Sequence, residues 1–83
     1  MDEQKVVAVL GGGSFGTVIG NIVAGNGHRV TLWLRNAARA QGINLERENS
    51  EYLPGYPLHA NLLATTSLSE AVAEADVLFV AVP

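Results

Sequence analysis

Short apolar runs recur along the chain and predict its strands. The segments from Lys5 to Leu10 and from Val77 to Val82 are apolar at nearly every position, which is typical of strands inside a sheet covered on both faces. Arg29 to Leu34 alternates, so that every second side chain shares a face, and Leu62 to Thr65 predicts a further short strand. Because nothing later in the chain can cover the last run, we expect the 83 residues to be the front part of a larger protein.

Between the first two strands, apolar residues recur at helical spacing and predict a helix from Ser14 to Ala24. A second row along this helix contains only small residues, Gly16, Gly20 and Ala24, which would let the helix backbone approach a sheet closely. The glycines of the segment from Gly25 to Gly27 would end the helix, because glycine accepts a left-handed backbone.

Two further helices complete an alternating pattern. Asn36 is a suitable N-cap for a helix from Ala37 to Glu48, and the spacing of Ser67 and Glu70 fits a capping box at the start of a short third helix. Residues 49–61, with two prolines and a glycine, predict a loop. Strict alternation of about four strands and three helices predicts an α/β, doubly wound parallel sheet, in which the last strand is an exposed edge beside the first.

The turn after the first strand reads Gly-Gly-Gly-Ser-Phe-Gly from position 11 and fits G-x-G-x-x-G at a strand-to-helix junction. Gly11 would permit the tight turn, Gly13 would let a pyrophosphate approach the backbone, and Gly16 would let the helix pack on the sheet. The backbone N–H groups of Ser14 and Phe15 are then the expected phosphate donors. The alternative is a glycine-rich loop without a ligand.

The end of the second strand bears on the kind of dinucleotide. This position often carries an acidic residue that binds the ribose of NAD, but here it holds Arg35 and Asn36. A guanidinium cannot accept a hydrogen bond from the ribose, but it can pair with a 2′-phosphate, which favours NADP over NAD. The alternatives are a solvated charge for Arg35 and a helix cap for Asn36.

Composition narrows the classes of partner and compartment. The chain has 48% hydrophobic residues, a formal net charge of -3 and no cysteine, which argues against nucleic-acid binding, disulfides and thiol chemistry. Its apolar runs are far shorter than the roughly 20 residues that span a bilayer, and its acidic start is unlike a signal peptide. We therefore expect a soluble, cytoplasmic protein without a membrane span.

The remaining chemically notable residues suggest structural roles. Trp33 on a strand face is expected in the core, and neither His28 nor His59 has a partner at a useful spacing for a metal ion or a general base. Ser14 lacks a partner base, so an N-cap or a phosphate contact suits it better than a nucleophile. The three glutamates at positions 46, 48 and 51 are most simply a solvated face. No catalytic residue and no metal site is predicted.

Four segments together resemble the N-terminal part of the bacterial NAD(P)-dependent glycerol-3-phosphate dehydrogenases. The Tyr-Leu-Pro-Gly stretch and the Trp-x-Arg strand end discriminate better than the glycines. The segments are Val9–Thr17, Gly27–Arg35, Glu48–Gly55 and Ala75–Pro83.

The resemblance implies a partial Rossmann-type NAD(P)-binding domain over residues 1–83, with the family's helical catalytic domain absent. It implies hydride transfer between NAD or NADP and dihydroxyacetone phosphate or sn-glycerol 3-phosphate, a small phosphorylated substrate, in support of phospholipid synthesis. By position, Ser14, Phe15, Arg35 and Tyr52 match the family's cofactor contacts, and the catalytic lysines would lie beyond Pro83. We expect the intact enzyme to be a homo-oligomer and the 83 residues alone to be inactive.

Three other functions stay open at this point. Another dehydrogenase could share this first domain, such as a ketopantoate reductase or a 6-phosphogluconate-type enzyme, although the segment from Tyr52 to Gly55 argues against it. A non-catalytic module that senses the redox state of a dinucleotide, or a structural α/β domain with an empty loop, would have the same glycine turn.

Overall fold

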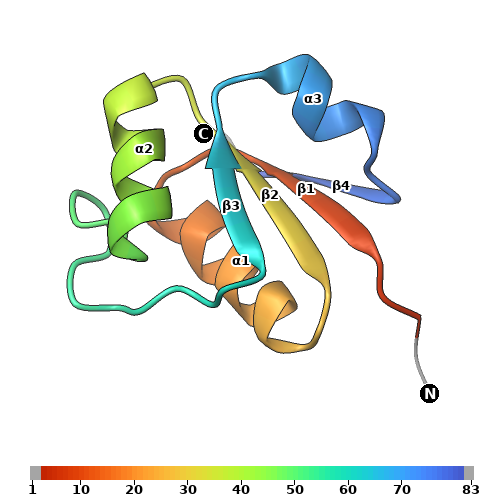
Figure 1. Cartoon of the computed structure of the whole chain (residues 1–83), viewed down its shortest axis with the longest axis horizontal. Helices are drawn as coiled ribbons and strands as arrows, with labels where there is room; N and C mark the ends of the chain where they lie inside the picture. The colour runs from red at the N-terminus through yellow and green to blue at the C-terminus, as the bar shows by residue number, and fades with distance from the viewer. Residues whose placement is uncertain (1–2, 82–83) are drawn as a thin grey trace.

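Strands and helices alternate along the whole chain, as the sequence predicts. The computed structural model describes residues 3–81. Its elements are β1 (Val6–Leu10), α1 (Ser14–Gly25), β2 (Arg29–Trp33), α2 (Ala37–Glu46), β3 (Leu62–Thr65), α3 (Leu68–Ala73) and β4 (Val77–Val80). All neighbouring strands are parallel, and their order in the sheet is β3-β2-β1-β4 (Figure 1). The predicted α/β, doubly wound architecture is confirmed.

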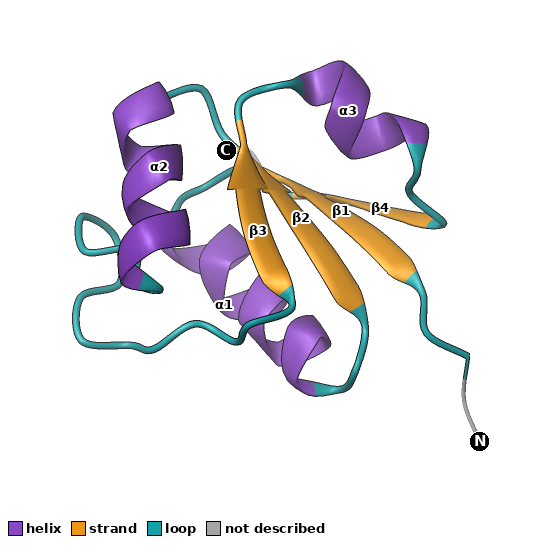
Figure 2. Cartoon of the chain, viewed as in Figure 1, coloured by secondary structure: helices purple, strands orange, loops and turns teal. Residues whose placement is uncertain are grey.

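The helices divide between the two faces of this sheet. Helices α1 and α2 cover one face, and α3 lies over the other (Figure 2). The strand register aligns Val9 with Leu32 and Leu32 with Ala64, and these side chains belong to the buried core beneath α1 and α2. The main core therefore lies on the sheet face that α1 covers, and α1 is the helix that follows the glycine turn.

The row of small residues on α1 faces the sheet, as expected. A Cβ atom added at Gly20 would lie 3.2 Å from Leu62 Cδ1 and 3.4 Å from Val30 Cγ1, and Ala24 is completely buried. Burial of this row brings the helix backbone close to the strands and leaves the start of α1 beside the end of β1.

Helix α2 is shorter than the sequence pattern suggests. It ends at Glu46 rather than Glu48, because Arg47 adopts a left-handed backbone with φ 58°. The guanidinium of Arg47 donates to the carbonyl oxygen of Leu62 at 2.6 Å and also to that of His59. These contacts offset the strain of the left-handed residue, and they attach the following loop to the start of β3.

The helix caps follow the sequence in part. Asn36 caps α2, since its Oδ1 accepts from the N–H of Arg39 at 2.9 Å. Ser67 caps α3 by accepting from the N–H of Glu70 at 3.2 Å, but the reciprocal half of the capping box is replaced: the N–H of Ser67 donates to Thr65 Oγ1 at 3.1 Å. Helix α3 ends at Ala73.

Strand β4 is the exposed edge that the fold class predicts. Asp76 joins its start to β1: the N–H of Asp76 donates to the carbonyl of Val6 at 2.7 Å, and its Oδ2 accepts from the N–H of Val6 at 2.9 Å. All four residues of β4 remain exposed, Val80 to 64%. The strand ends at Val80, so the predicted extension is wrong at Ala81, and Val82 lies outside the described residues.

Candidate functional site

A cleft opens at the carboxyl ends of β1 and β2, where the chain enters α1 and α2. Its larger part has a volume of about 840 Å³, and an adjoining hollow of about 470 Å³ lies over the start of α1. Gly13 and Tyr52 line both parts. The cleft thereby brings together every site residue named from the sequence, which are Gly11, Gly13, Ser14, Phe15, Gly16, Arg35 and Tyr52.

Glycine is present at each position of the motif for a different structural reason. Gly11 has φ 131°, a backbone conformation that favours glycine, and its N–H donates to the carbonyl of Trp33 at 2.9 Å. A Cβ atom at Gly16 would lie 2.1 Å from the carbonyl oxygen of Gly11, so only glycine fits there. A Cβ atom at Gly13 would meet nothing within 4 Å. The space beside Gly13 is therefore open to the cleft.

The start of α1 has no side-chain cap. The N-cap residue is Gly13, and the expected capping role of Ser14 is wrong because Ser14 is already the first helical residue. The first turn also contains no acidic residue. The first N–H groups of a helix have no partner inside the helix, and the helix dipole adds a partial positive charge there. This end of α1 is suited to an anion.

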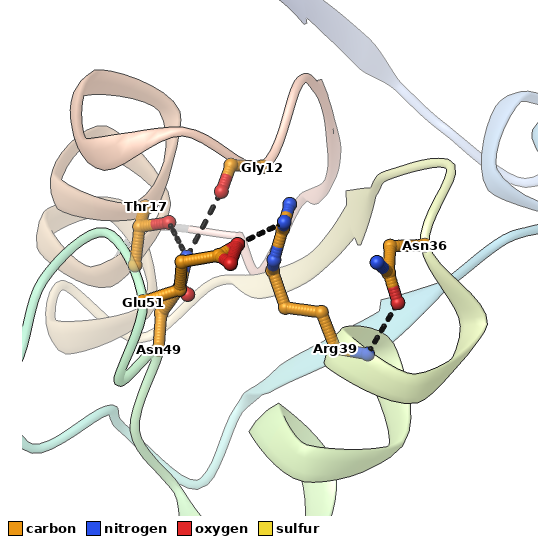
Figure 3. A network of polar contacts seen from close by, with 6 residues as sticks. All are labelled: Gly12, Thr17, Asn36, Arg39, Asn49 and Glu51. Atoms are coloured by element: carbon orange, nitrogen blue, oxygen red, sulfur yellow. Dashed lines mark hydrogen bonds and ion pairs between the residues drawn. The ribbon is translucent and has the colours of Figure 1, made fainter.

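The opposite side of the cleft, after β2, carries two arginines. The side chain of Arg35 is exposed and has no hydrogen bond or ion pair within residues 3–81. Arg39 lies over the ring of Tyr52, with 4.6 Å from its guanidinium carbon to the ring centroid. It also forms an ion pair with Glu51 (Figure 3). Arg35, with Arg39 beside it, suits a second anionic group at this edge.

The glutamates are therefore not merely a solvated face. Glu51 holds Arg39 in place at the cleft, and Oε2 of Glu48 accepts from the N–H of Gly55 at 2.8 Å. Both carboxylates stabilise the loop that carries Tyr52 to the cleft, whereas Glu46 is exposed at the end of α2.

Trp33 differs from the expected core residue. It is half-buried, its Nε1 donates to the carbonyl of Thr66 at 3.0 Å, and it lines the cleft. The two histidines serve the backbone: Nδ1 of His28 accepts from the N–H of Lys5, and Nδ1 of His59 accepts from the N–H of Asn61. Among residues 3–81, no three acidic or histidine side chains gather as metal ligands would.

Two residues of the site have no individual signal in the sequence. Arg39 is an ordinary helix residue by its spacing, and Asn49 lies in a loop without periodicity. In the structure Arg39 lines the cleft, while Asn49 is completely buried under the glycine turn. Their partners are distant in sequence, so only the tertiary structure shows what they contact.

The chemistry of the cleft suits a long, anionic ligand. Uncapped helix amides and an open glycine would hold a diphosphate, and Arg35 with Arg39 would hold a further phosphate. A parallel sheet, a G-x-G-x-x-G turn and a cleft at the carboxyl ends of the strands define the Rossmann-type class of dinucleotide-binding domains.

Comparison with known proteins narrows this class to one family. The family model of the NAD-dependent glycerol-3-phosphate dehydrogenase N-terminus matches residues 6–83. The chain belongs to this family. The match favours it over the other dehydrogenases that share such a first domain.

Curated relatives agree along the entire chain. It is 55% identical to a glycerol-3-phosphate dehydrogenase (NAD(P)+) of Saccharophagus degradans and 58% identical to one of Teredinibacter turnerae, in each case over all 83 residues. The chain spans 23% and 24% of these two relatives, about a quarter of their length.

Solved structures of the same name share the fold. A crystal structure of glycerol-3-phosphate dehydrogenase from Coxiella burnetii superposes with a TM-score of 0.89 at 30% identity, over 96% of this chain and 25% of that one. The yeast enzyme gives a TM-score of 0.87 at 29% identity, over 98% of this chain and 27% of the other. Within residues 3–81, no helix has the length and apolar character needed to cross a membrane.

Proposed function

We propose that residues 1–83 are the partial N-terminal NAD(P)-binding domain of a glycerol-3-phosphate dehydrogenase. One observation carries the proposal: the open backbone at Gly13, the uncapped start of α1 and Arg35, which is unpaired among residues 3–81, line one continuous cleft. The residues present fit a dinucleotide, because the cleft offers two separate anion-binding regions with open space between them.

The seven site residues divide into two kinds. Gly11 and Gly16 give the turn its shape, and Gly13 leaves room for the diphosphate, which the N–H groups of Ser14 and Phe15 would bind. Arg35 would pair with the 2′-phosphate of NADP, and Tyr52, 46% exposed at the junction of the two hollows, would contact the cofactor from the loop.

The activity proposed for the intact protein follows from its family. It would interconvert dihydroxyacetone phosphate and sn-glycerol 3-phosphate, supplying glycerol phosphate for phospholipid synthesis in the cytoplasm, as a homo-oligomer. The nicotinamide cofactor would supply or accept the hydride, while this chain's residues bind and orient it. The chain's single lysine, Lys5, precedes β1 at the end of the sheet remote from the cleft and pairs with Glu3 at 3.3 Å. We therefore propose that the catalytic residues lie outside these 83 residues.

Titration with cofactor tests the binding function directly. Trp33 is the single tryptophan and lines the cleft, so its emission should change when NADPH or NADH binds, and calorimetry should record heat. A folded chain that gives neither signal with either dinucleotide would refute the proposal. That result would leave a structural α/β domain with an empty loop as the better interpretation.

Replacement of Arg35 by aspartate should shift the preference between cofactors away from NADPH. We expect Arg35→Asp to weaken NADPH binding by about 30-fold or more, because it removes a charge-assisted hydrogen bond and adds repulsion toward the 2′-phosphate. NADH has no 2′-phosphate for Arg35 to contact, so its dissociation constant should change by less than about threefold. A tenfold change would need about 1.4 kcal/mol of altered contact. Dissociation constants for both cofactors provide the measurement.

Arg29→Asp is the matched control for this substitution. Arg29 is exposed at the start of β2, away from the cleft, so the same change of net charge should leave both dissociation constants nearly unaltered. An unchanged ratio in Arg35→Asp, or an equal change in Arg29→Asp, would remove the specific role assigned to Arg35.

A further inference from the structure

A buried polar relay lies directly under the glycine turn. Asn49 and Thr17 are both completely buried. Nδ2 of Asn49 donates to the carbonyl oxygen of Gly12 at 2.9 Å and to Thr17 Oγ1 at 2.9 Å (Figure 3). Thr17 Oγ1 in turn donates to the carbonyl oxygen of Gly13 at 2.7 Å. The carbonyl of Gly12 is thus held from below by the Asn49 side chain, and the carbonyl of Gly13 accepts from both the hydroxyl of Thr17 and its backbone N–H, the latter at 3.0 Å.

The chemistry of the partners fixes the orientation of the Asn49 amide. A carbonyl oxygen only accepts hydrogen bonds, and Thr17 uses its own hydrogen on Gly13, so its oxygen must accept from Asn49. The group that faces both oxygens is therefore the NH₂ group. Oδ1 of Asn49 is buried without a hydrogen-bond partner among the described residues. Leucine would fill a similar volume without burying an unpaired oxygen, so filling space does not explain an asparagine here.

Because peptide groups are planar, these buried hydrogen bonds also set the direction of N–H groups that face the cleft. In a trans peptide, the C=O of one residue and the N–H of the next point in opposite directions. Holding the carbonyl of Gly12 therefore fixes the N–H of Gly13, and holding the carbonyl of Gly13 fixes the N–H of Ser14. Glycine restricts its own backbone less than other residues do, so the contacts from Asn49 and Thr17 add a restraint that keeps these donors aligned.

We propose that Asn49 and Thr17 are positioning residues that preset the N–H groups of Gly13 and Ser14 for a diphosphate. The inference rests on the proposed function. Asn49 also connects the turn to the loop of Tyr52. Its side chain contacts the turn, and its own carbonyl accepts from the N–H of Leu53 in the loop at 2.7 Å. Loop and turn therefore form one unit that is ordered before the ligand binds, which reduces the entropy lost on binding.

Thr17→Val is the most informative substitution, because it removes only the hydroxyl and keeps the shape. We expect it to raise the dissociation constant for NADPH by about tenfold, and Asn49→Leu to have at least that effect. Binding of adenosine 2′-monophosphate, which lacks the diphosphate, should stay within about twofold in both variants. Thr17→Ser retains the hydroxyl and should recover most of the NADPH affinity.

A second measurement reads the positioning without a ligand. Residual dipolar couplings report the orientation of the N–H bonds of Gly13 and Ser14 in the free chain, and they should change or average in Thr17→Val but not in Thr17→Ser. If the unsubstituted chain binds no dinucleotide, the proposed function fails, but these couplings still decide the positioning role. Unchanged couplings in Thr17→Val would overturn the inference. Unchanged NADPH affinity, or an equal loss for both ligands, would also overturn it and leave the proposed function intact.

Discussion

Gly16→Ala is expected to destabilise the fold strongly, by about 3 kcal/mol or more of unfolding free energy. The added methyl would lie 2.1 Å from the carbonyl oxygen of Gly11 and 3.2 Å from its carbon. Both are backbone atoms in a turn that is hydrogen-bonded to β2, so no flexible side chain can move aside. Urea unfolding followed by circular dichroism measures the change, and a loss of this size removes a large part of the free energy of unfolding of a marginally stable domain.

Gly42→Ala is the matched control, because Gly42 also lies inside a helix. A Cβ atom there would meet nothing within 4 Å, and its φ lies outside the left-handed region. Alanine should stabilise the chain by about 0.5–1 kcal/mol through its higher helix propensity. If Gly16→Ala were as stable as Gly42→Ala, the close contact between α1 and the turn would be wrong.

Gly13→Val is expected to abolish most dinucleotide binding while leaving the fold intact. The backbone of Gly13, with φ -76° and ψ -174°, is extended, and β-branched residues adopt such a backbone readily. Its Cβ direction meets no protein atom within 4 Å, so the side chain would occupy space in the cleft. We expect the NADPH dissociation constant to rise on the order of 100-fold, or about 2.7 kcal/mol, because the diphosphate can no longer approach the backbone. Calorimetric titration provides the measurement.

Gly25→Val controls for the introduction of a branched residue at the other end of α1. Gly25 is the last residue of α1, and a Cβ atom there also meets nothing within 4 Å. This variant should bind NADPH like the unsubstituted chain. Normal binding by Gly13→Val would show that the ligand does not approach the backbone at this position, whereas an unfolded Gly13→Val would contradict the open space beside it.

Gly13 and Gly16 belong to one motif but differ in what their missing side chains permit. At Gly16 the empty Cβ position is filled by the protein's own backbone, so glycine serves the fold. At Gly13 that position is open to the cleft, so glycine serves the ligand. Stability and affinity should therefore separate between the two variants.

The fold was predictable because its signals are local. Apolar runs, helical periodicity and caps such as Asn36 depend on neighbours within a few residues, and alternation of strands and helices restricts the topology to few solutions. The errors lie where a distant contact overrides a local tendency. Helix α2 ends early, before Arg47, which has a left-handed backbone and whose guanidinium contacts the carbonyl of Leu62, 15 residues away.

The sequence by itself determined the glycine turn, the order of the elements and Arg35 as the charge after β2, because parallel strands bring these features to the same end of a sheet. Only the tertiary structure decided how the loop of residues 47–61 meets that end. It places Asn49 beneath Gly12, 37 residues away in sequence, and Glu51 on Arg39. Such contacts depend on where a loop without periodicity lies after the core has formed, and no spacing in the sequence encodes that position.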